Sequence, residues 1–145
     1  MEKYLAKDCR ELHAVDISSV MLSKAYDRLP FANVFLKLGN GKDLRMYPDA
    51  KFDAVFSLLV LQHLEKEDAF FYLLEIHRVL KDAGTFVVQL PNLQSQKHFD
   101  AFLMYVFASQ DQRPAARVRG YSRDEVEFIL TKAGFRVMEL RESGA

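Results

Sequence analysis

Short apolar runs alternate along the chain with stretches in which apolar residues recur every three or four positions. Short apolar runs favour strands, and the wider spacing favours amphipathic helices. The expected strands cover residues 11–17, 33–38, 51–61, 85–90 and 135–142, and the expected helices cover residues 2–8, 18–29, 66–81, 99–107 and 122–134. Because strands and helices alternate, we expect βαβ units that form a Rossmann-like parallel sheet with helices on both faces.

Several of these elements carry more specific expectations. The run "KFDAVFSLLVL" is apolar almost throughout, which predicts a strand buried on both faces in the middle of the sheet. Ser18 or Ser19 is expected to cap one helix, and Gly84 to end the helix over 66–81. Ser122 with Glu125 matches a capping box, and Gly134 fits the end of that last helix. The very apolar helix over 99–107 is expected to cover the sheet or a pocket.

Composition narrows the class of protein. The 145 residues are 50% apolar, enough for one core and one domain over 1–145. Twenty basic and twenty acidic residues give a net charge of zero, so no overall field would attract nucleic acid or an anionic membrane. No run approaches the ~20 apolar residues of a membrane span. The single cysteine, Cys9, has no neighbours at metal-ligand spacing, so we expect no metal site and a reducing, cytoplasmic setting.

Two candidate ligand-binding stretches follow expected strands. Asp16 stands where open α/β sheets bind ligands, and its carboxylate can accept hydrogen bonds from the two hydroxyls of a ribose. An acid at this place can equally cap the next helix. The second stretch, "LGNGKDL", contains Asn40 and Gly41, and its glycines allow a flat ring to approach the backbone. An ordinary turn explains the same residues.

A third stretch, "SLLVLQHLEKED", places Ser57, Gln62 and His63 at or after the end of the apolar run over 51–61. A histidine there can act as a general base, although a packing or capping role is the more frequent one. The three arginines that follow the apolar helix can bind an anionic substrate, or they can lie in a solvent-exposed loop. They are Arg113, Arg117 and Arg119.

In this order, the pieces resemble the class I S-adenosylmethionine-dependent methyltransferases, especially those that act on small molecules. "VDISSVMLSKA" is similar to the second motif of that family, and "LGNGKDL" is similar to its adenine loop. The stretch from Phe52 to Pro91 resembles its fourth and fifth strands with the intervening helix. "YSRDEVEFILTKAGFRVMEL" resembles its penultimate helix and strand.

The resemblance implies S-adenosylmethionine as cofactor and a small-molecule methyl acceptor as substrate. It implies that Asp16 holds the ribose hydroxyls, that Ile17 packs on the adenine, and that Asn40 and Gly41 contact the same ring. Asn40 replaces the usual aspartate of the family, which accepts from the adenine amino group, and its amide oxygen can accept in the same way without the charge. The resemblance also implies that Ser57 and Leu58 lie near the methionine part of the cofactor. It implies that Gln62 and His63 face the methyl acceptor.

The family also has a first strand with a glycine-rich loop and a last strand, and neither has a counterpart in this sequence. We therefore expect an incomplete methyltransferase fold that binds the cofactor weakly or not at all, which leaves the activity of this chain alone open. Removing a strand from between two partners leaves a gap of about 9–10 Å, twice the ordinary spacing. The strand ending at Asp16 can pair directly with residues 53–60, the chain can share strands with a second copy in a homodimer, or the fold can be loosened.

Two other functions remain open at this point. One is a non-catalytic methyltransferase-like module that acts by associating with itself or with a partner through open sheet edges. The other is a nicotinamide-dependent dehydrogenase, which also places an acid after its second strand. The dehydrogenase is disfavoured because the only Y-x-x-x-K spacing, Tyr47 to Lys51, contains Pro48.

Overall fold

The computed structural model describes residues 2–142. Its internal contacts divide the chain into two compact units, Met1–Asp43 and Leu44–Ala145, which we call the N-terminal and C-terminal units. Each contains parallel strands and helices, as expected of an α/β protein. The expectation that 1–145 form a single domain stays a prediction.

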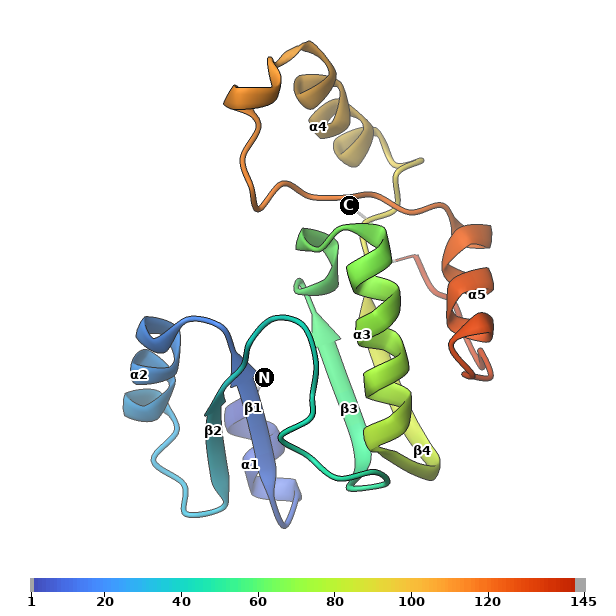
Figure 1. The fold of residues 1–145 in the computed structure, drawn as a ribbon. Helices are drawn as coiled ribbons and strands as arrows, with labels where there is room; N and C mark the ends of the chain where they lie inside the picture. The colour runs from blue at the N-terminus through green and yellow to red at the C-terminus, as the bar shows by residue number, and fades with distance from the viewer. Residues whose placement is uncertain (1, 143–145) are drawn as a thin grey trace. The chain divides into compact units, whose positions relative to one another are not determined.

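The N-terminal unit is built on two parallel strands. Its elements are α1 (Glu2–Asp8), β1 (Leu12–Asp16), α2 (Ser19–Arg28) and β2 (Val34–Leu38) (Figure 1). The strands pair in register from Leu12 beside Val34 to Asp16 beside Leu38, so their carboxyl ends meet at one edge. The expected cap of α2 is confirmed, because the Ser18 hydroxyl accepts a hydrogen bond from the Met21 amide at 3.3 Å.

The C-terminal unit contains the second pair of parallel strands and most of the helices. Its elements are β3 (Phe52–Leu58), the 3-10 turn η1 (Leu61–His63), α3 (Lys66–Val79), β4 (Leu80–Gln89), α4 (Gln96–Phe107), the 3-10 turn η2 (Gln110–Gln112) and α5 (Arg123–Lys132). In Figure 1, α3 runs along β3 and β4, whereas α4 stands away from them. The carboxyl ends of β3 and β4 also share an edge, with Leu58 beside Gln89.

The main apolar core of the C-terminal unit lies among η1, α3, α5 and β4. Its most buried members are Leu61, Leu73, Leu130 and Ala133, and partly buried residues from β4 and from the segment after α5 pack against them. The removal of apolar side chains of this size from water is the main force that holds such helices on a sheet. This core therefore supports η1 directly at the end of β3.

The two ends of α5 agree with the sequence. The Ser122 hydroxyl accepts from the Glu125 amide at 3.2 Å, although the Glu125 carboxylate pairs with Lys66 rather than returning to the cap. After α5, Gly134 has a φ of +100°, and the Phe135 amide donates to Leu130 at 3.0 Å. This is the left-handed helix end that favours glycine.

Three expectations about individual elements are wrong. Gly84 does not cap α3, because Leu80 is already extended and the chain enters β4 directly. The apolar helix α4 covers neither sheet nor pocket, since it has no buried residue. Within the described chain, residues 135–142 pair with no strand, although Phe135 and Val137 pack on the core. Extended segments become strands only through a neighbouring backbone partner.

The central strand is also less covered than the sequence indicates. Within residues 2–142, β3 pairs with β4 alone and β1 with β2 alone, so the sheet topology has no direct pair between the strand ending at Asp16 and residues 53–60. Phe56 is 46% exposed, although "KFDAVFSLLVL" predicts burial on both faces. An apolar run indicates that both faces of a strand are suited to burial. The described residues bury β3 only in part.

Candidate functional site

Two sheet edges carry the candidate residues, one in each unit. In the N-terminal unit, β1 ends at Asp16 and β2 leads into residues 39–43. The Gly39 amide donates to the Asp16 carbonyl at 2.9 Å, which continues the pairing of the two strands past their ends. A β carbon on Gly39 would lie 2.7 Å from the Val15 side chain. The loop therefore approaches β1 more closely than it could with a side chain at this position.

Asp16 uses one carboxylate oxygen within the chain. Its Oδ1 accepts a hydrogen bond from the Ser18 amide at 2.8 Å, which fixes the turn between β1 and α2. This contact partly supports the capping interpretation of the residue. Among the described residues, no donor reaches Oδ2, so this oxygen can accept from a bound hydroxyl.

Ile17 and Gly41 lie side by side at the same edge. Gly41 has a φ of +70°, and a β carbon built on it would lie 3.2 Å from the Ile17 side chain. Ile17 itself is 71% exposed, and Leu38 at the end of β2 is 60% exposed. An exposed apolar side chain beside a bare backbone forms a surface on which a flat aromatic ring can pack.

Asn40 is oriented differently from the expectation. Its Oδ1 accepts from the Lys42 amide at 2.9 Å and from the Asp43 amide at 3.0 Å, so both lone pairs of the amide oxygen serve its own loop. The Asn40 oxygen is therefore occupied in this structure, and Nδ2 is the group it can offer to an adenine. The sequence signal for this turn was present, since Asn-Gly favours such local bonds.

In the C-terminal unit, the end of β3 carries the second set of residues. Ser57 is buried and pairs in register with Val88, and Leu58 is partly buried beside Gln89. The next residue, Leu59, has a φ of +60° and is 58% exposed. A left-handed leucine costs free energy, and such strain is frequent at functional edges.

Gln62 and His63 form a hydrogen-bonded pair in η1. The His63 Nδ1 lies 2.8 Å from the Ala116 carbonyl oxygen, and its Nε2 lies 3.2 Å from the Gln62 amide nitrogen. A carbonyl can only accept, so Nδ1 carries the proton and Nε2 accepts from Gln62. His63 therefore presents a basic nitrogen toward a side chain that is itself buried.

The expected basic loop is held by a carboxylate. Arg119 donates from Nε and from Nη2 to the two carboxylate oxygens of Glu65. Arg117 donates to the same carboxylate at 3.2 Å. Hydrogen bonding from Arg119, with smaller contributions from the charges of both arginines, lowers the pKa of Glu65. Two of the three arginines are thus paired within the chain, and sequence reasoning did not identify Glu65.

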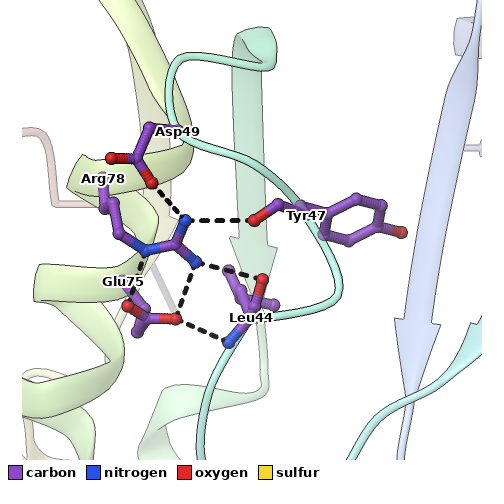
Figure 2. Close-up of polar contacts among 5 residues, drawn as sticks. All are labelled: Leu44, Tyr47, Asp49, Glu75 and Arg78. Carbon is purple, nitrogen blue, oxygen red and sulfur yellow. Dashed lines mark hydrogen bonds and ion pairs between the residues drawn. The ribbon is translucent and has the colours of Figure 1, made fainter.

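A third polar cluster fastens the loop before β3 to α3 (Figure 2). Arg78 donates to both oxygens of Glu75, to the Asp49 carboxylate and to the carbonyls of Leu44 and Tyr47. The Glu75 carboxylate also accepts from the Leu44 amide at 2.9 Å. All five N–H donors of Arg78 are engaged, so the cluster has a structural role.

Taken by element order, the two units define a class of protein. Parallel βα units with a carboxylate after one strand and a glycine loop after the next are typical of Rossmann-like α/β proteins that bind nucleotides at strand ends. Over residues 1–88 the chain matches the model of a methyltransferase domain family. The chain belongs to this family, whose class I fold and dependence on S-adenosylmethionine agree with the resemblance read from the sequence.

Solved structures share the fold at low sequence identity. An S-adenosylmethionine-dependent methyltransferase from Thermotoga maritima is 24% identical, with a TM-score of 0.67 over 87% of this chain and 55% of that one. A second, from Aquifex aeolicus, is 22% identical, with a TM-score of 0.64 over 94% of this chain and 66% of that one. The [4+2]-cyclase SpnF is 19% identical, with a TM-score of 0.68 over 94% and 47%.

These comparisons establish the fold. The chain spans about half of the length of the first and third of these solved proteins. No curated protein matches the chain. Among residues 2–142, no helix is both long enough and apolar enough to cross a membrane.

The family and the fold imply S-adenosylmethionine, and the edge of the N-terminal unit fits its adenosine part. Asp16 offers a carboxylate oxygen for hydroxyls, Ile17 offers an exposed apolar side chain, and Gly41 leaves the backbone bare beside it. An acceptor for the ribose hydroxyls, an apolar face and a close approach to the backbone are features with which a protein can hold adenosine.

Proposed function

We propose that this chain contributes to methyl transfer from S-adenosylmethionine to a small-molecule acceptor. The observation that carries the proposal is the neighbouring placement of Asp16, Ile17 and Gly41 at one sheet edge. In this proposal Asp16 accepts from the ribose hydroxyls, while Ile17 and Gly41 contact the adenine ring. Asn40 donates from its amide nitrogen to the ring, because its oxygen is engaged by the loop.

The C-terminal unit carries the groups that we assign to the methionine part and the acceptor. The bound cofactor supplies an activated methyl group on a sulfonium. Ser57 and Leu58 line the methionine part, and the pair Gln62 and His63 faces the acceptor. The His63 Nε2 takes the proton that the acceptor loses when it is methylated. Before the acceptor binds, the Gln62 amide donates a hydrogen bond to this nitrogen, and the acceptor then takes the place of Gln62.

This arrangement favours an acceptor with a proton on the methylated atom. Gln62 is a donor toward His63 Nε2, so the group that replaces it must also donate, as a hydroxyl or an uncharged amine does. A small acceptor with a hydroxyl or an uncharged amine agrees with this contact. A cytoplasmic location, which the single cysteine favours, stays a prediction.

Calorimetric titration with S-adenosylmethionine tests the proposal. Asp16→Asn keeps an oxygen for the Ser18 amide but replaces the other carboxylate oxygen with a donor, so binding should weaken by about 10- to 100-fold. Asp27→Asn, in the exposed part of α2, is the matched control and should leave binding unchanged. Equal affinities for Asp16→Asn and the unaltered chain would contradict the assignment.

A non-catalytic module is the second candidate, and the sheets favour it. Each described sheet has only two strands, and Phe56 and Val87 are 46% and 42% exposed. Open strand edges with apolar residues favour association, here as a homodimer. Sedimentation should then show a dimer without the cofactor, and a monomer at all concentrations would exclude a module that acts by self-association.

A further inference from the structure

The contacts around η1 include two charged residues to which the proposed function gives no role. We propose that Arg119, held by Glu65, is a positioning residue that fixes His63 in the tautomer with a basic Nε2. The proposal rests on the proposed function only in taking Gln62 and His63 as acceptor-facing. It concerns the loop of residues 113–121, which lies far from η1 in sequence.

Arg119 contacts η1 at two backbone positions. Its amide donates to the Gln62 carbonyl at 2.9 Å, and one terminal nitrogen of its guanidinium donates to the His63 carbonyl at 2.7 Å. The same nitrogen reaches the Arg117 carbonyl at 2.9 Å. Arg119 therefore joins its own loop to both residues of the candidate pair.

Glu65 holds the guanidinium in this place. It follows η1 by two residues, and its two carboxylate oxygens accept from two nitrogens of Arg119. The Arg119 side chain is only 12% exposed, whereas that of Glu65 is 54% exposed. A two-point arginine and carboxylate contact fixes orientation as well as distance, which a lysine would not do.

The consequence for His63 comes through Ala116. The loop that Arg119 fastens brings the Ala116 carbonyl to 2.8 Å from His63 Nδ1, which requires the proton on that nitrogen. Which nitrogen of a neutral imidazole carries the proton is set by the hydrogen bonds that the ring makes, so a basic Nε2 depends on an acceptor at Nδ1. Without the Arg119 contacts, the Ala116 carbonyl would lose its fixed position and the tautomer preference would disappear.

The tautomer is measurable without cofactor or substrate. Two-bond proton-nitrogen correlation spectra distinguish the two neutral tautomers, and recording them near pH 8.5 keeps an ordinary imidazole uncharged. The chain has four histidines, and His63→Asn identifies the His63 signals by their loss. The unaltered chain should show the Nδ1-protonated form.

Two variants and one control complete the experiment. Glu65→Gln and Arg119→Gln should each move His63 toward a mixture of both tautomers. Arg117→Gln should not, because Arg117 reaches Glu65 but donates to neither Gln62 nor His63 through its side chain. Since Arg119→Gln can disturb folding, Glu65→Gln, at an exposed carboxylate, decides the case.

The results separate this proposal from the proposed function. An unchanged tautomer in a folded Glu65→Gln variant would overturn the positioning role, and so would an Nε2-protonated His63 in the unaltered chain. Neither result bears on whether Asp16 binds the cofactor. Conversely, a failed cofactor titration would leave the tautomer effect of Glu65 and Arg119 intact.

Discussion

The Arg78 guanidinium donates to both carboxylate oxygens of Glu75, one helical turn earlier in α3, at 2.8 and 2.9 Å. From this fixed position it also reaches the carbonyls of Leu44 and Tyr47, in the loop that precedes β3 (Figure 2). The side chains of Glu75 and Arg78 are 13% and 27% exposed, so solvent screens the pair only partly. The pair fixes the loop and the start of β3, and through them the strand that carries Ser57.

Arg78→Lys tests this role. A lysine keeps the charge but has three donors that cannot occupy five fixed directions, so buried acceptors lose their partners. We expect the free energy of unfolding to fall by about 1 to 3 kcal/mol in urea denaturation. Arg141→Lys is the control, since Arg141 is 80% exposed and should change stability by less than about 0.5 kcal/mol. Equal stability of the two variants would contradict the role of Arg78.

The pKa of Glu75 provides a pH test of the same cluster. The hydrogen bond from Arg78 lowers this pKa below its ordinary value of 4.5, against the effect of burial. A lowered pKa in the folded state means that the unfolded chain binds the proton more readily. The stabilisation is therefore present above pH 4.5 and is lost as the pH falls through the folded-state pKa.

Glu75→Gln isolates this contribution. At neutral pH the variant should be less stable than the unaltered chain, and the difference should shrink when both are unfolded in urea at about pH 3. Other carboxylates also titrate in this range, but they titrate in both proteins and cancel in the comparison. A difference that stays constant or grows with acidification would show that the Glu75 carboxylate is not stabilised by Arg78.

Gly134 supports the contact between α5 and α3. Its φ is +100°, and a β carbon there would lie 2.8 Å from His77 Nε2. Gly134→Ala should therefore lower the melting temperature and cost about 1 to 3 kcal/mol, from backbone strain and from the displaced imidazole. In a His77→Ala background, the same change should cost less because only the strain remains. Equal costs in the two backgrounds would mean that the imidazole does not limit the site.

The features predicted correctly from the sequence are local. The caps at Ser18 and Ser122 depend on residues three positions away, and the helix end at Gly134 depends on a single backbone conformation. Because these contacts are short-range, the pattern contains all the information they need. The meeting of Asp16, Ile17 and Gly41 has a different cause, because β1 and β2 are parallel and parallel strands bring their carboxyl ends to one edge.

The features missed by the sequence depend on distant partners. Glu65 and Arg119 are 54 residues apart, so no spacing predicts their contact, and the sequence leaves the basic loop as either solvated or substrate-binding. The exposure of β3 and α4, and the unpaired segment after α5, depend on which surfaces are available to cover them. A sequence pattern indicates which surfaces are suited to burial, but the packing of distant segments determines which of these surfaces are buried.

Nuclear magnetic resonance titration of the amide signals with S-adenosylhomocysteine tests the central claim most directly. This compound keeps the adenosine and lacks only the transferred methyl group. We predict that the largest shifts fall on Asp16 to Ser18 and on Gly39 to Lys42, and that they are much smaller in Asp16→Asn at the same ligand concentrations. Shifts that leave these two segments unmoved, or a titration without any shift at millimolar ligand, would contradict the assignment of an adenosine site to this sheet edge.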